Sequence, residues 1–64
     1  MKNEYISSLS LEVRKAAHIQ RMFSQTRGLE FDIMVNSQAV YCSFDAGDAK
    51  QFCLDNRLST RMVN

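Results

Sequence analysis

The sequence predicts a small two-layer α+β sandwich, in which two helices cover one face of an antiparallel sheet. Three patterns lead to this prediction. Residues 10–27 repeat apolar side chains at the helical period, residues 29–44 contain two segments rich in alternating apolar and polar side chains, and residues 46–56 return to the helical period. Because a helix turns every ~3.6 residues and a strand alternates faces every two, these patterns distinguish the two kinds of element.

The first expected helix spans residues 10–27. Ser8 or Ser10 suits its N-cap, Glu12 favours the positive end of the helix dipole, and Gly28 readily ends a helix in a left-handed conformation. One side of this helix is apolar and carries Val13, Ala16, Ala17, Ile19 and Phe23. The opposite side is basic around an apolar pair, and we interpret it as a candidate partner-binding surface made of Leu11, Arg14, Lys15, His18, Arg21 and Met22.

A β-hairpin is expected next, with strands at residues 29–35 and 39–44 and a turn at residues 36–38. We expect a register that gathers the apolar side chains on the covered face by pairing Val35 with Val40, Ile33 with Cys42 and Phe31 with Phe44. The uncovered face then carries Glu30, Asp32, Met34, Tyr41 and Ser43. Met34 and Tyr41 form a second candidate partner-binding patch there, which Tyr5 would join from the first strand and which Arg57 and Arg61 would flank from the last.

The second expected helix spans residues 46–56, with Asp45 as its N-cap. Residues 4–8 and 57–63 are expected to form short strands at the ends of the chain. The resulting order is the ferredoxin-like βαββαβ arrangement, which reduces to αββα if the terminal segments are not strands. The expected core consists of Phe23, Phe31, Ile33, Val40, Phe44 and Phe52, together with Cys42 and Cys53 as buried, reduced thiols.

Two segments resemble parts of RNA recognition motif domains. Tyr5-Ile6-Ser7-Ser8-Leu9-Ser10 resembles their first-strand motif, and Val40-Tyr41-Cys42-Ser43-Phe44 followed by Asp48-Ala49 is similar to their third strand and second helix. The resemblance supports the ferredoxin-like arrangement. It implies that Tyr5 and Tyr41 would stack on unpaired bases.

Composition argues against several classes of function. The chain has 64 residues, enough for one domain spanning 1–64, and its net charge of +1 argues against nucleic-acid binding by bulk charge alone. One histidine and two cysteines are too few for a closed zinc site, and two glycines provide no phosphate-binding loop. No apolar run reaches the ~20 residues of a membrane span or the length of a signal peptide. We therefore expect a cytoplasmic protein that is not an enzyme, needs no cofactor or metal, and binds no membrane.

Three carboxylates, Glu30, Asp32 and Asp45, are expected near one end of the hairpin. Carboxylates can do acid–base work when a cleft perturbs their pKa values, but a two-layer domain of this length offers little cleft. We interpret them as solvated or structural groups. A protein interface is the next alternative, and catalysis or a cation site is the last.

These observations favour a small protein-binding module, such as an inhibitor, adaptor or modulator that docks on a larger protein. Compact domains without cofactors are frequent among phage and mobile-element proteins that alter host machinery. The alternative is a single-stranded nucleic-acid-binding domain that uses an open sheet face with Tyr5 and Tyr41. A homodimer that covers this face stays open as a third arrangement.

Overall fold

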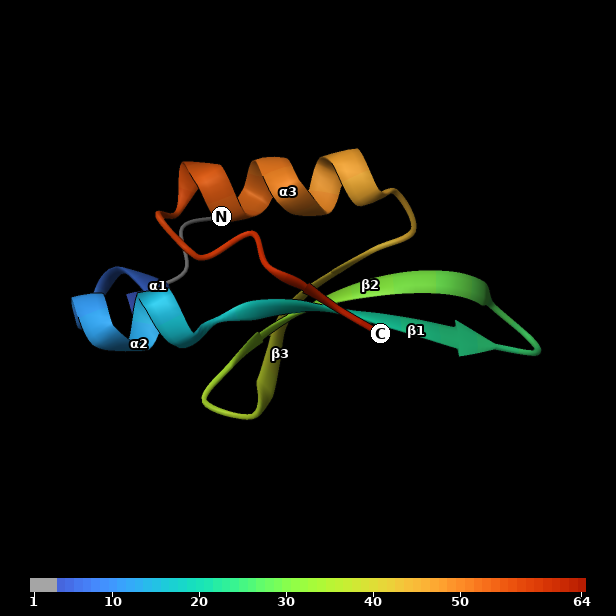
Figure 1. Cartoon of the computed structure of the whole chain (residues 1–64), viewed down its shortest axis with the longest axis horizontal. Coiled ribbons are helices and arrows are strands. Elements are labelled where there is room, and N and C mark those ends of the chain that lie inside the picture. The colour runs from blue at the N-terminus through green and yellow to red at the C-terminus, as the bar shows by residue number, and fades with distance from the viewer. Residues whose placement is uncertain (1–3) are drawn as a thin grey trace.

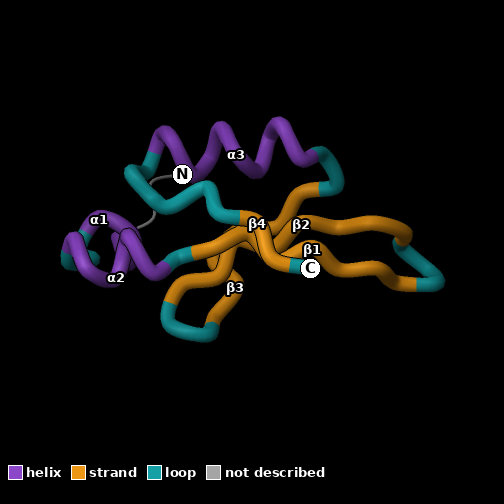
Figure 2. Tube along the Cα trace, in the orientation of Figure 1, coloured by secondary structure: helices purple, strands orange, loops and turns teal. Residues whose placement is uncertain are grey.

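The computed structural model describes residues 4–64, which form three helices and a four-stranded mixed sheet (Figure 1). In chain order the elements are α1 (Glu4–Ser7), α2 (Leu11–Ala16), β1 (His18–Ser24), β2 (Gly28–Val35), β3 (Gln38–Ser43), α3 (Ala46–Asp55) and β4 (Met62–Val63). The sheet order is β3-β2-β1-β4, in which β2 is antiparallel to both neighbours and β4 is parallel to β1. Helix α3 lies over one face of the sheet, and α1 and α2 sit together at one end of it (Figures 1 and 2).

The hydrophobic core lies between α3 and the sheet. Ile19 and Ile33 on adjacent central strands are fully buried, as are Ala49 and Cys53 on α3. The remaining members of the cluster are Ala17, Phe31, Val35 and Leu58. Burial of each large apolar side chain contributes roughly 1.5–3 kcal/mol. The expected core positions of Phe31, Ile33 and Cys53 are thus confirmed, and Val40 and Phe52 pack against the core while partly buried.

The predicted helix at residues 10–27 is wrong beyond Ala16. Ser10 does cap α2, with its Oγ accepting a hydrogen bond from the Val13 amide at 3.3 Å. Ala17 is extended, with φ −64° and ψ 156°, and the chain continues as β1. Residues 18–24 also contain a β-branched and an aromatic side chain that suit a strand, and pairing with β2 buries Ile19 against Ile33. Long-range pairing of this kind overrides a helical pattern that propensity alone supports weakly.

The ends of the chain also differ from the prediction. The segment expected as a strand at residues 4–8 contains helix α1 instead, and the expected strand at 57–63 is confined to Met62–Val63. Because the second part of the expected first helix is strand β1 and the expected first strand contains a helix, the ferredoxin-like order is not matched. The coarser prediction, a small α+β structure, is confirmed.

The hairpin formed by β2 and β3 is confirmed, but its expected register is wrong. Asn36 and Ser37 have φ values of 51° and 65° and make a two-residue turn, where three residues were expected. The turn pairs Val35 with Gln38 and Met34 with Ala39. An irregularity between Ile33 and Met34 then skips Val40, so that Ile33 is opposite Tyr41 and Asp32 is opposite Cys42. A shift of one residue moves every side chain of a strand to the other face.

The shifted register has three consequences for the expected core. Cys42 is exposed and lies on the face away from α3, so the prediction that it is buried is wrong. Phe44 is 61% exposed. Phe23 is 76% exposed for a different reason, because its segment is strand β1 and not the expected helix. Tyr41 leaves the open face and packs on α3, where its ring stacks on Phe52 with centroids 4.1 Å apart.

Candidate functional site

The expected basic helix face does not form a single surface. Leu11, Arg14 and Lys15 lie on α2, whereas His18, Arg21 and Met22 lie on β1. Arg14 is half-buried, and its guanidinium donates hydrogen bonds to the backbone carbonyls of Ile6, Leu9 and Asn56. The Arg14 guanidinium is thus engaged by hydrogen bonds within the chain, while the side chains of Leu11 and Lys15 are exposed.

The expected open-face patch is also divided. Met34 is half-buried on the face away from α3, but Tyr41 is on the α3 side and donates a hydrogen bond to Asp48 Oδ2 at 2.7 Å. Tyr5 belongs to α1, where its hydroxyl accepts a hydrogen bond from Asn36 Nδ2 at 3.0 Å. The structure therefore does not bring Met34, Tyr5 and Tyr41 together on one sheet face.

The clearest exposed apolar surface is at the projecting end of the β1–β2 hairpin, which extends past α3 (Figure 1). Phe23 is opposite Leu29 in the ladder, and the two side chains are 76% and 38% exposed. Met22 is 48% exposed. Because this part of the hairpin has no helix over it, its apolar side chains remain open to solvent. We call Arg21, Met22, Phe23 and Leu29 the hairpin surface.

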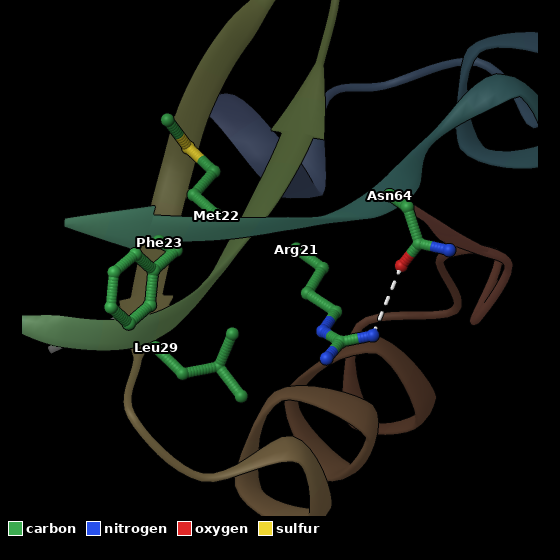
Figure 3. A pocket seen from close by; sticks show the side chains of 5 residues that line it. All are labelled: Arg21, Met22, Phe23, Leu29 and Asn64. Atoms are coloured by element: carbon green, nitrogen blue, oxygen red, sulfur yellow. Dashed lines mark hydrogen bonds between the residues drawn. The ribbon is translucent and has the colours of Figure 1, made fainter.

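A pocket of about 350 Å³ lies at the hairpin surface, and Asn64 completes its lining (Figure 3). Arg21 and Leu29 point to one side of the sheet and Met22 to the other. Arg21 donates a hydrogen bond to Asn64 Oδ1 at 3.3 Å, which draws the end of β4 toward the pocket. The pocket therefore combines an apolar wall with one guanidinium group, a chemistry typical of protein interfaces.

A second group of side chains lies on the sheet face away from α3, the face to which Met22 also points. One ligand atom each from Glu30, Asp32 and Cys42 lie within 4.8 Å of one another, and we call these residues the acid–thiol cluster. Asp32 and Cys42 are cross-strand partners, and Glu30 is two residues from Asp32 on the same strand, so all three share this face. The Asp32 residue is only 8% exposed, and its Oδ1 is buried with no hydrogen-bond partner among residues 4–64.

The electrostatics of the acid–thiol cluster reflect this crowding. Burial and the neighbouring Asp32 and Glu30 carboxyl groups raise the pKa of the Cys42 thiol to about 11. Hydrogen bonding to Asp32, followed by burial, raises the pKa of Glu30, and Arg27 opposes this rise. Arg27 contacts Glu30 Oε1 at 3.2 Å and lies 5.5 Å from the centre of the Phe44 ring. The cluster thus concentrates negative charge and a thiol beside one guanidinium group.

The sequence analysis grouped Glu30 and Asp32 with Asp45 instead of Cys42. Asp45 is the N-cap of α3, and its Oδ2 accepts a hydrogen bond from the Asp48 amide at 2.8 Å. A two-residue turn at Asn36-Ser37 would by itself place Cys42 opposite Phe31. The irregularity between Ile33 and Met34 moves Cys42 opposite Asp32, and no feature of the sequence signals that irregularity. The hairpin surface was missed because Phe23 was assigned to the apolar side of a helix.

Within residues 4–64, no helix is both long enough and apolar enough to cross a membrane. Comparison with protein-family models, with curated proteins and with solved structures found no match to this chain.

Proposed function

We propose that the chain is a small protein-binding module that docks on a larger protein through the hairpin surface. The observation that carries this proposal is Phe23, a large aromatic side chain held 76% exposed on a regular strand. Leu29, its cross-strand partner, extends the apolar area beside it, and the adjoining pocket can accept an apolar side chain. Exposed apolar patches on a small protein commonly mark interaction sites.

Arg21 indicates the chemistry of the partner. Among the described residues its guanidinium has no carboxylate partner, and it donates a hydrogen bond to the neutral Asn64 side chain. Arginine and aromatic side chains dominate the energetics of protein interfaces. We therefore propose a partner that presents an apolar side chain to the pocket and a carboxylate to Arg21.

A larger partner fits this surface better than a second copy of the chain. In a symmetric dimer each residue of the patch faces the same patch of the other subunit, so two Arg21 side chains would approach one another. Like charges at an interface oppose association. The two free cysteines, Cys42 and Cys53, fit a reducing compartment, so we propose that binding takes place in the cytoplasm.

The test is a pair of matched variants. Phe23→Ala removes the exposed aromatic group, and Leu54→Ala removes a similarly exposed leucine, 63% exposed, from α3. Both should change the free energy of unfolding by less than about 0.5 kcal/mol. The partner protein is captured in the presence of nuclease, purified, and titrated with each variant. Its affinity for Phe23→Ala should be roughly 30-fold lower than for the wild type, which corresponds to about 2 kcal/mol. Its affinity for Leu54→Ala should equal that for the wild type.

Charge variants check the orientation of the proposed complex. Arg21→Glu should weaken binding, while Lys15→Glu, an exposed charge reversal on α2, should leave it unchanged. Equal binding by wild type and Phe23→Ala would contradict the proposal. It would also fail if nuclease abolished capture, or if sedimentation showed a wild-type homodimer that Phe23→Ala dissociates.

A further inference from the structure

We propose that the acid–thiol cluster, Glu30, Asp32 and Cys42, is a binding site for a thiophilic divalent cation, with zinc as the best match. The proposal is independent of the hairpin surface and of its partner. It is based on two observations: three ligand atoms lie within 4.8 Å of one another, and the Asp32 Oδ1 is buried without a hydrogen-bond partner among the described residues.

Asp32 supplies the independent observation. Its residue is only 8% exposed, and the buried Oδ1 has no hydrogen-bond partner in the part of the chain that the structure describes. The Asp32 carboxyl group interacts with Glu30 and Cys42, but its buried Oδ1 has lost its hydration and accepts no hydrogen bond from residues 4–64, which is costly. A bound cation would compensate that cost directly.

The donor set selects the kind of cation. Zinc accepts thiolate and carboxylate ligands together, whereas magnesium and calcium prefer oxygen ligands alone. Three protein ligands would leave a fourth, tetrahedral position for water. Zinc–ligand bonds are about 2.0–2.3 Å long, so a cluster that spans 4.8 Å needs to contract by about 1 Å. Rotation of the exposed Cys42 side chain and of the longer Glu30 side chain can provide this movement.

Charge and access also fit a cation. On binding, the Cys42 thiol would lose its proton to the solvent as the zinc–sulfur bond forms. Two carboxylates and a thiolate carry a charge of −3, so a divalent ion leaves −1, and the neighbouring Arg27 at Glu30 Oε1 balances it. Cys42 is exposed on the uncovered sheet face, which gives the ion a direct path from solvent.

Metal titration of the chelator-treated full chain tests the proposal. Zinc should bind with a stoichiometry of one, measured by calorimetry. Cobalt used in place of zinc should give a thiolate-to-metal charge-transfer band in the near ultraviolet. The band reports Cys42 unambiguously in variants, because the chain has only two cysteines and Cys53 is buried in the core.

Two variants and one control identify the ligands. Cys42→Ser should abolish the cobalt band, and both Cys42→Ser and Asp32→Asn should weaken zinc binding at least about tenfold. Asp55→Asn makes the same change of charge on α3, outside the cluster, and should bind zinc as wild type does. Circular dichroism establishes that each variant is folded, and Cys42→Ser keeps the test decisive if Asp32→Asn does not fold.

Thermal melting provides a second readout. At the same zinc concentration, the melting temperature should rise for the wild type and for Asp55→Asn, and should rise less for Asp32→Asn. Three results would overturn the proposal: no saturable zinc binding by the wild type, a cobalt band that persists in Cys42→Ser, or calcium or magnesium competing as well as zinc.

Discussion

Arg14 joins three segments of the chain through its side chain. The guanidinium donates to the carbonyl of Ile6 at the end of α1, of Leu9 between α1 and α2, and of Asn56 after α3. Its own backbone carbonyl accepts a hydrogen bond from the Ser59 amide at 3.1 Å. The planar fork of an arginine suits several acceptors at once, which a lysine cannot match. A residue that the sequence placed on a binding surface is therefore part of the framework.

We expect Arg14→Met to lower the free energy of unfolding by about 1.5–3 kcal/mol, because it removes hydrogen bonds from a charged donor and leaves three carbonyls without it. Urea unfolding followed by circular dichroism measures the change. Lys15→Met is the matched control, since Lys15 is exposed next to Arg14 on α2, and it should stay within about 0.5 kcal/mol of wild type. Equal stability of the two variants would show that the Arg14 contacts contribute nothing.

Strand β3 and helix α3 are linked by a side-chain hydrogen bond in addition to the stacking of Tyr41 on Phe52. The Tyr41 hydroxyl donates to Asp48 at 2.7 Å. This bond lowers the pKa of Asp48 below its ordinary value of 3.8, with help from Ser43, and raises the pKa of Tyr41 above 10.0. The link between the two elements therefore depends on pH at both extremes.

The sign of each dependence follows from the direction of the pKa change. Because folding lowers the pKa of Asp48, its contribution to stability is fully present above pH 3.8 and is lost as pH falls through the lower native value. Because folding raises the pKa of Tyr41, its contribution is fully present below pH 10.0 and is lost as pH rises through the higher native value.

We expect Tyr41→Phe to be less stable than wild type at neutral pH, and the difference to vanish in strong acid and in strong alkali. Urea unfolding over a pH series measures it. Tyr5→Phe is a suitable control, because the Tyr5 hydroxyl bonds to the neutral Asn36 amide and its contribution should not fall in acid. A Tyr41→Phe difference that stays constant down to the lowest pH would contradict the link.

The elements that local chemistry defines were predictable from sequence, and those that depend on distant pairing were not. Asp45 and Ser10 start α3 and α2 as expected, because an N-cap acts within one turn. The β2–β3 hairpin follows from alternation and a short turn. Residues 18–24 suit both a helix and a strand, and only pairing with β2 decides between them. The candidate sites could not be predicted for the same reason, because both the hairpin surface and the position of Cys42 depend on strand pairing.

At the scale of the whole molecule, Cys53 reports on cooperative unfolding. Its thiol is fully buried, and burial raises its pKa. A chain of this length has a free energy of unfolding of about 3–10 kcal/mol. In a Cys42→Ser background, we expect native Cys53 to react with a thiol reagent at least roughly a hundredfold more slowly than the denatured chain. Its labelling should rise with urea along the unfolding transition, and fast labelling of the native protein would show that α3 opens by itself.

The parallel pairing of β4 with β1 has a consequence for the order in which the molecule assembles. The turns that join β1, β2 and β3 are short, whereas Gln20 and Val63, which pair across β1 and β4, are 43 residues apart in the chain. Closing so long a loop costs more entropy than closing a hairpin. The two residues of β4 that pair with β1 offset only a small part of that cost. We therefore expect the three antiparallel strands to form first and β4 to join last. Until it does, the outer edge of β1 is an unpaired template on which another strand can add.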